Sequence, residues 1–185
     1  MGLTITEALA EIKTIGKRLA KKRETVGTYL ARPMRVIDPL QEQGGSLNAL
    51  KAERQAIADL EERVVDLRLA IADANFKTEI TVEGETRTIQ EWLTWRREVA
   101  PGRTAFLGAL RQRIEMVRRE AASKGLNVTA EGGATAGMND VLVSIDEKQL
   151  AADMEHLEKI LGVLDGQLSL KNATTTIEDG AAPTA

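Results

Sequence analysis

A regular seam of apolar residues in residues 46–74 constrains the fold of this chain more than any other feature. The seam recurs in alternating steps of three and four, and seven of its eight residues are apolar: Leu50, Glu53, Ile57, Leu60, Val64, Leu67, Ile71 and Ala74. This spacing predicts a coiled-coil helix about 43 Å long. A helix of that length cannot be covered on all sides in a chain of 185 residues, so it must lie along a second long helix.

The second long helix is predicted over residues 4–31, where apolar residues at helical spacing form one face. Thr4 and Glu7 have the spacing of a capping box, which marks the start of a helix. Pro33 ends the helix, because the residue before a proline disfavours the helical region. Residues 34–45 are rich in Pro and Gly and predict a connecting loop. The two helices are therefore expected to fold back antiparallel.

A change of periodicity after the seam helix predicts a short β-hairpin over residues 75–87. β-Branched residues alternate there around a Gly turn. Two strands alone are marginal in water, so this hairpin needs a partner surface. A second capping box, Thr88 with Glu91, begins the next helix. We expect Pro101-Gly102 to interrupt this helix after about Val99, and the helix to resume near Arg103.

The last third of the chain contains a second heptad seam. Residues 126–139 are Gly-rich and predict a loop or a loose hairpin arm, and residues 141–145 look like a strand. A helix is predicted over residues 146–168, with Leu150, Met154, Leu157, Leu161, Leu164 and Leu168 as its seam. The polar tail, residues 169–185, has a composition typical of disorder unless a partner or a neighbouring copy holds it.

These segments predict a mainly α fold: an antiparallel coiled-coil helical hairpin with a small β-hairpin and further helices. We expect residues 1–124 to contain the helical hairpin, the β-hairpin and the third helix. Residues 125–168 would contain the Gly-rich loop, a short strand and the second heptad helix, followed by the tail at 169–185.

Two short patterns recur and indicate an internal duplication. Thr4-Ile5-Thr6-Glu7-Ala8-Leu9 matches Thr88-Ile89-Gln90-Glu91-Trp92-Leu93. Residues 75–84 resemble residues 172–180 with one residue deleted, and in both places a heptad helix is followed by an Asn-x-x-Thr…Gly pattern.

The composition excludes most kinds of catalytic and metal site. With no Cys and one His, thiol chemistry and Cys-based zinc sites are ruled out. His156 lies off the seam and should point to solvent, with no catalytic set around it. Glu62 and Asp66 share a helix face but lack the Glu-x-x-His motif of a di-metal core. The Gly-rich residues 132–137 lack the Gly-Lys-Ser/Thr ending of a phosphate loop. We expect no enzyme, cofactor or metal.

Charge alternates in blocks: net +3 over residues 1–45, −4 over 46–86, +5 over 87–124 and −7 over 125–185. Blocks of opposite sign predict that segments pair with each other, within a chain or between chains. The basic face over 96–124 is a candidate for nucleic acid, although no aromatic residues are interleaved with it. Trp92 and Trp95 either pack in the core over the hairpin or anchor an interface, since Trp and Arg dominate binding hot spots.

The order of these motifs resembles that of septicolysin-like, or deflagellation-inducible-protein-like, helical-hairpin proteins over about residues 1–120. The resemblance rests on caps and turns: Thr4, Glu7, Leu9, Asn75, Thr78, Gly84, Thr88, Glu91 and Leu93. It implies a helical-hairpin architecture and no catalytic residue, and the family name alone implies a membrane-acting role. The chain departs from the pattern at Pro101-Gly102 and after residue 125. Its general style is similar to that of accessory proteins of tailed bacteriophages.

The sequence thus predicts a non-enzymatic structural protein of a repeated assembly, such as a phage head, neck or tail. Two heptad seams expose more apolar surface than one chain easily buries, so we expect a homo-oligomer that docks to other structural proteins. No apolar run reaches the ~18 residues of a membrane span. We expect the protein in a virion after synthesis in the cytoplasm, or otherwise in the cytoplasm. The expected contact residues are Ile80, Val82, Trp92, Trp95, Arg96, Arg97, Arg111, Arg118, Leu157, Leu161 and Ile177.

Overall fold

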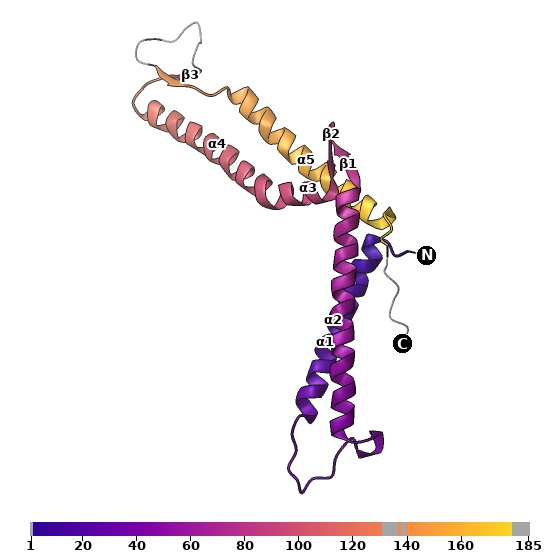
Figure 1. Ribbon diagram of the computed structural model, residues 1–185. Helices are drawn as coiled ribbons and strands as arrows, with labels where there is room; N and C mark the ends of the chain where they lie inside the picture. The colour runs from indigo at the N-terminus through magenta and orange to yellow at the C-terminus, as the bar shows by residue number, and fades with distance from the viewer. Residues whose placement is uncertain (1, 131–136, 138–139, 179–185) are drawn as a thin grey trace. The chain divides into compact units, whose positions relative to one another are not determined.

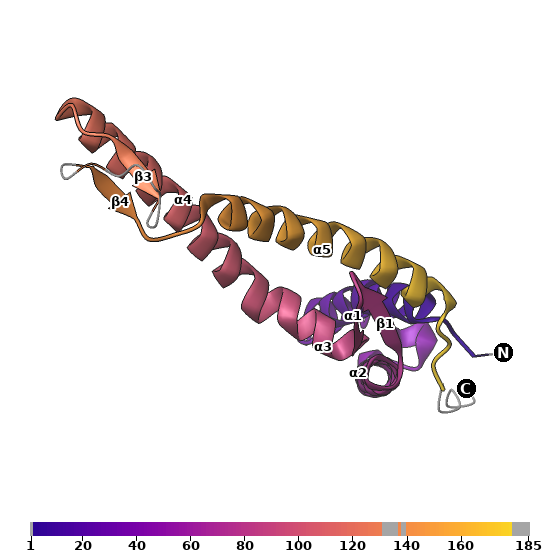
Figure 2. The same cartoon turned by 90° about the horizontal axis from the view of Figure 1, so that it is seen from above.

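The computed structural model describes residues 2–130, 137 and 140–178, and it is mostly helical (Figure 1, Figure 2). In chain order the elements are α1 (Ile5–Tyr29), the 3₁₀ turn η1 (Gln41–Gln43), α2 (Ser46–Lys77), β1 (Glu79–Val82), β2 (Glu85–Thr88), α3 (Ile89–Thr94), the π-helical turn η2 (Trp95–Val99), α4 (Ala100–Ser123), β3 (Val128–Ala130), β4 (Val141–Val143) and α5 (Glu147–Thr174). The predicted mainly α fold, with a small β-hairpin and several helices, is confirmed.

The chain divides into two compact units. The first unit comprises residues 1–78 together with residues 169–185, and the second comprises residues 79–168. The predicted boundary after residue 124 therefore falls inside the second unit, between α4 and β3. Residues 169–178 belong to the N-terminal unit, whereas the prediction set the tail apart as a segment of its own.

In the first unit, α1 and α2 lie side by side and run antiparallel (Figure 1). The predicted seam of α2 faces α1 and is best buried where the helix nears its C-terminal end, at Leu67 and Ile71. Ion pairs join the two helices along their length: Lys22–Glu53 at 2.9 Å, Arg23–Glu61 at 2.6 Å and Glu11–Arg63 at 2.8 Å. The seam and the charges together fix the register of this helical hairpin.

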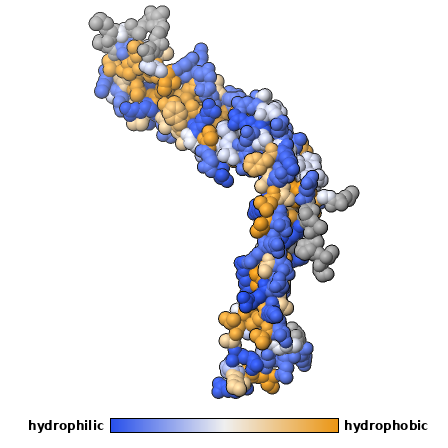
Figure 3. Space-filling view, viewed as in Figure 1, coloured by the Kyte–Doolittle hydropathy of each residue, from blue (hydrophilic) through white to orange (hydrophobic). Residues whose placement is uncertain are grey.

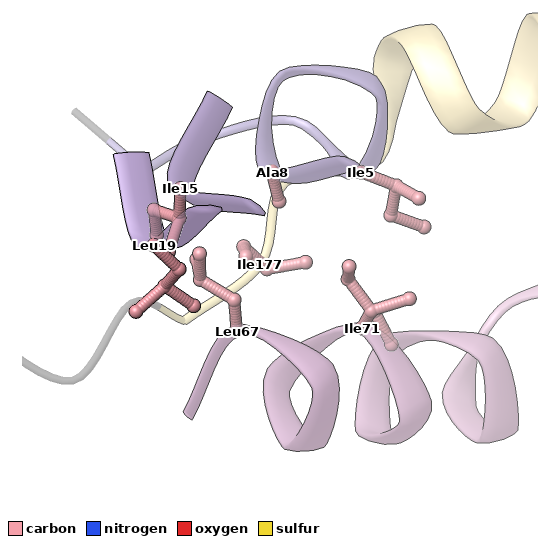
Figure 4. Packing of buried hydrophobic residues seen from close by; sticks show 8 residues of the cluster. Ile5, Ala8, Ile15, Leu19, Leu67, Ile71 and Ile177 are labelled. Carbon is pink, nitrogen blue, oxygen red and sulfur yellow. The ribbon is translucent and has the colours of Figure 1, made fainter. Parts of the chain in front are cut away.

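The core of the first unit includes a residue from the far end of the chain. Figure 4 shows Ile177 between Ile5 and Ala8 of α1 and Leu67 and Ile71 of α2. Burial of such aliphatic side chains stabilises a fold by roughly 1.5–3 kcal/mol each. The α1–α2 pair is therefore closed at this end by a third segment of the same chain.

The tail does not behave as its composition predicts. Residues 169–174 continue α5, and the next residues pair with the N-terminus. The Ile5 N–H donates to the Thr175 carbonyl oxygen (3.0 Å), the Ile177 N–H donates to the Leu3 carbonyl oxygen (2.8 Å), and Thr4 and Thr176 form an antiparallel bridge. The prediction of disorder is therefore wrong for residues 169–178, because backbone pairing and burial of Ile177 hold them. Residues 179–185 lie outside the described residues.

In the second unit, β1 and β2 form the predicted hairpin, with Glu79 opposite Thr88 and Val82 opposite Glu85. Glu83 (φ 49°) and Gly84 (φ 86°) form its turn. Two successive positive φ angles are those of a type I′ turn, which matches the twist of the flanking strands. The inner face of the hairpin packs on Ile89, Trp92, Ile160, Leu164 and Leu168. These residues of α3 and α5 supply the partner surface that two strands need.

Helix α5 also packs along α4, and its predicted seam is used in this contact. Leu150 and Leu157 are buried with Leu107 and Ile114. Beyond this contact, β3 pairs with β4 in parallel, with Val128 opposite Val141. The predicted loop or loose hairpin arm over residues 126–139 falls mostly on residues that the structure does not describe, and its described strand, β3, pairs with β4 instead. Residues 131–136, 138 and 139 lie outside the described residues.

The helix that begins at Thr88 is not interrupted at Pro101-Gly102, so that prediction is wrong. The irregularity precedes the proline: residues Trp95–Val99 form a π-helical turn, and α4 continues from Ala100 through Pro101 and Gly102. Proline has no backbone N–H to donate to the carbonyl oxygen four residues earlier, and its ring clashes with that carbonyl group. The wider π turn accommodates both effects without a break in the helix.

The two units repeat one arrangement, as the recurring patterns predict. Both capping boxes have the same geometry: the Thr4 and Thr88 hydroxyls accept from the Glu7 and Glu91 N–H groups at 3.2 Å. The strand pairs also correspond, because Thr176 opposite Thr4 takes the place of Glu79 opposite Thr88. The equivalent core residues are Ile5 and Ile89, Ala8 and Trp92, Leu67 and Leu164, Ile71 and Leu168, and Ile177 and Ile80.

Candidate interaction surfaces

The Trp pair belongs to the core of the second unit. Trp92 is 1% exposed, and its indole N–H donates to the Ile80 carbonyl oxygen at 3.2 Å. Trp95 is half-buried and meets Trp92 edge to face, with ring centroids 5.5 Å apart. The Arg87 guanidinium lies 4.9 Å from the centroid of the Trp92 ring, on its face. Of the two interpretations, core packing holds for Trp92, and only Trp95 keeps exposed surface.

Several other expected contact residues are also buried within the chain. Ile80 and Val82 are 2% and 0% exposed under α3 and α5, and Ile177 is 2% exposed in the first unit. Leu157 packs against α4, and Leu161 is half-buried beside it. Ile80, Val82, Leu157 and Ile177 are covered by their own chain, and of this group only Leu161 keeps part of its surface exposed. Their apolar character reflects intramolecular packing.

Three arginines of the basic face over residues 96–124, Arg96, Arg97 and Arg118, are paired with acids. Arg96 lies 2.7 Å from Asp165, and Arg97 lies 2.6 Å from Glu98. Arg118 contacts Glu147 of α5 at 2.6 Å and Glu115 at 3.0 Å. Arg111 makes no ion pair among the described residues, but four glutamates line the same hollow between α4 and α5: Glu115, Glu147, Glu155 and Glu158. The positive charge that the sequence displays here is therefore partly neutralised.

A hollow of about 380 Å³ lies beside the Trp pair in the second unit. Its lining brings together Trp95, Arg87, Arg103, Asp153 and the single histidine, His156. His156 is exposed, as its place off the seam predicts. No hydrogen bond or ion pair joins it to another described residue.

The loop end of the α1–α2 pair carries a group of exposed apolar side chains that the sequence analysis did not single out. Leu30, Met34, Ile37 and Leu47 are between 71% and 100% exposed, and we call them the tip cluster. Figure 3 shows apolar side chains interspersed with polar ones at this end of the helical hairpin. A monomer rarely exposes grouped apolar side chains, so the tip cluster is the first candidate surface.

The loop that carries the tip cluster is held by Asp38. Its carboxylate accepts hydrogen bonds from the Ser46 N–H (2.8 Å), the Leu40 N–H (3.0 Å) and the Ser46 hydroxyl. These bonds, the hydroxyl of Ser46 first, lower the pKa of Asp38 from 3.8 to about 2. An ionised Asp38 thus bridges the loop to the start of α2.

The described residues include no group of three or more His, Asp or Glu side chains placed to hold a metal ion. In the same part of the chain, no helix is both long and apolar enough to cross a bilayer. Of the Gly-rich residues 132–137, all but Gly137 lie outside the described residues.

In comparisons with known proteins, no family model, no curated protein and no solved structure matches this chain. The resemblance to septicolysin-like proteins therefore stays a prediction from caps and turns.

Proposed function

We propose that this chain is a non-enzymatic structural or assembly protein, which works by binding copies of itself and neighbouring proteins in a repeated assembly. The observation that carries the proposal is the tip cluster at the loop end of the α1–α2 pair. Leaving four large apolar side chains in water is unfavourable by about 25 cal/mol per Å² of apolar surface. A binding partner that covers them recovers this free energy.

The geometry of the loop supports binding over chance exposure. Asp38 fixes the loop through three hydrogen bonds, and Arg32 donates to the Val36 carbonyl oxygen at 2.6 Å. A surface that is already ordered loses little conformational entropy when it binds. The long α1–α2 pair then serves as a rigid support that presents the tip cluster to a partner.

The particular assembly that we propose is the virion of a tailed bacteriophage, in its head, neck or tail, with synthesis in the cytoplasm. Virion parts are repeated many times, so a small chain gains function by binding identical neighbours. Self-pairing of coiled-coil character along the helices, and docking through the tip cluster, would provide such contacts.

Nucleic acid is the alternative partner, and the ion pairs of Arg96, Arg97 and Arg118 argue against it. A phosphate backbone would have to displace those carboxylates. A salt titration decides between the two: nucleic-acid binding weakens steeply as salt rises. Absence of any salt-dependent affinity for DNA or RNA at low salt would end this alternative. The membrane-acting role implied by the septicolysin-like resemblance is tested by a separate experiment, in which the protein is added to loaded vesicles and leakage of their contents is measured.

The proposed function is tested by the mass of the protein in solution and by its presence in particles. Light scattering over a range of concentrations should give a mass above the 20.1 kDa of one chain. Antibodies to the chain should label purified virions that carry its gene. Met34→Asp with Ile37→Asp should weaken association without loss of helix content, whereas Leu170→Asp, an exposed residue outside the tip cluster, should not. A monomer at every concentration that is absent from particles would refute the proposal.

A further inference from the structure

Helix α2 carries a second row of residues besides the seam that faces α1. The row keeps the three-and-four spacing and consists of Ala58, Glu62, Val65, Leu69, Ala72 and Phe76. Leu69 and Phe76 are 65% and 63% exposed, so this row faces solvent. We call it the outer row of α2. An amphipathic helix needs only one apolar face to pack into its own unit, and a second such face calls for another partner.

Helix α4 carries an outer row of the same length. Its members are Gly102, Phe106, Ala109, Arg113, Met116 and Glu120. The buried face of α4 uses other residues, Leu107 and Ile114, against α5. Phe106 and Met116 are 61% and 48% exposed. Each outer row spans about 27 Å at 1.5 Å per residue.

The two outer rows are complementary in size when they are set antiparallel. With Phe76 opposite Gly102, Ala72 falls opposite Phe106 and Leu69 falls opposite Ala109. In these three pairs, at one end of the rows, a large side chain meets a small one, which is the arrangement that lets facing helices interdigitate. A row set against a copy of itself in the same orientation would place Phe76 on Phe76 and lose this match.

The charges along the rows are complementary as well. In the same register Arg113 falls opposite Val65, between the carboxylates of Glu62 and Asp66. None of these three charged side chains has an ion-pair partner among the described residues. The surrounding segments differ in sign, with net −4 over residues 46–86 and net +5 over residues 87–124. Opposite potentials favour the encounter of the two surfaces and set their register.

We propose that the outer row of α2 binds the outer row of α4 in a second copy of this chain, with the two helices antiparallel. The inference deepens the proposed function, on which it rests, by naming the self-contact of the assembly. Two different surfaces meet in this contact, so it is heterologous. Repetition of such a contact from copy to copy builds a ring or a filament, which suits a repeated assembly.

Single cysteines test the contact directly, because the natural chain has none. Leu69→Cys and Ala109→Cys are made in separate chains, mixed and oxidised. The proposal expects a disulfide-linked species of twice the chain mass in the mixture and not with either variant alone. Leu69→Cys mixed with Ala122→Cys is the matched control, since Ala122 is exposed on another face of α4. Equal cross-linking of Leu69→Cys with itself, or with Ala122→Cys, overturns the proposal.

Charge reversal tests the register and separates this inference from the proposed function. Arg113→Glu should weaken self-association at least about tenfold, and Glu62→Arg with Asp66→Arg in the same chain should restore it. All three positions are exposed, so circular dichroism should show unchanged helix content. If the parent is an oligomer whose mass is unaffected by Arg113→Glu and by Leu69→Glu, the α2–α4 contact is refuted and the proposed function stands. If both cysteines placed in one chain join within a monomer, the second copy is refuted.

Discussion

At the scale of single residues, Asp38 determines the shape of the loop that presents the tip cluster. Asp38→Ala should loosen the loop, because the Ser46 and Leu40 N–H groups lose their acceptor. The expected result is faster amide hydrogen exchange over residues 34–48 and weaker association through the tip cluster. Asp38→Asn is the matched control for size and should recover part of the protection, since its amide oxygen still accepts hydrogen bonds.

The same residue makes the loop sensitive to acid. Because folding lowers the pKa of Asp38 from 3.8 to about 2, its contribution to stability is complete above pH 3.8 and is lost as the pH falls through about 2. A carboxyl-carbon NMR titration should therefore give a midpoint near 2 for Asp38 in the folded protein. A midpoint near 3.8 would show that the Ser46 and Leu40 bonds are not formed in solution.

A local motif was predictable from the sequence where all of its hydrogen bonds lie within four consecutive residues. The capping boxes of Thr4 and Thr88 are present with both reciprocal hydrogen bonds, because a cap depends only on its own turn. The effect of Pro101 was not predictable in the same way. The sequence shows a proline inside a helical pattern, but it does not show that the turn before it widens to a π helix.

At the scale of elements, the short C-terminal strand is expected to stabilise the first unit. Ile177→Ala should lower the free energy of unfolding of this unit by about 2–5 kcal/mol, the range for truncating a buried aliphatic side chain. The residue is 2% exposed between α1 and α2. Amide exchange in a urea series should show the loss in both helices of the α1–α2 pair.

Two matched variants accompany this prediction. Ile80→Ala removes the equivalent residue of the second unit and should raise exchange in α3 and α5 instead. Leu170→Ala changes an exposed residue of α5 and should leave both units within about 0.5 kcal/mol of the parent. If Ile177→Ala behaves like Leu170→Ala, the C-terminal strand does not hold the first unit in solution.

The elements themselves were mostly predictable, but their partners were not. Periodicity located α2 and α5, because a heptad seam is written into consecutive turns of one helix. It did not show that the seam of α5 packs partly on α4 and partly on the β-hairpin and α3. It also did not show that Leu69 and Phe76 form a second, exposed row on α2. The parallel pairing of β3 with β4 and the burial of Ile177 depend on contacts distant in sequence. Such contacts leave no local signal in a single chain.

At the scale of the whole molecule, the two units are two versions of one arrangement, and they differ in how their strands are connected. In the second unit the Glu83–Gly84 turn joins β1 to β2. In the first unit the equivalent strands are the two ends of the chain, where the Ile177 N–H donates to the Leu3 carbonyl oxygen at 2.8 Å. The chain is thus equivalent to a closed loop of two repeats, opened at one of its two hairpin turns.

This equivalence predicts that the opening can be moved from one turn to the other. A circular permutant would join residue 178 to residue 2 by a loop of about four residues centred on Asn-Gly and would begin at Gly84. Both strand pairs are kept, so its free energy of unfolding should lie within about 1 kcal/mol of the parent, with the same helix content by circular dichroism. A permutant opened between Val64 and Val65 is the matched control and should unfold, because the cut divides the buried seam of α2. If the permutant opened before Gly84 unfolds like that control, the terminal strands are not equivalent to β1 and β2, and the two-repeat description fails.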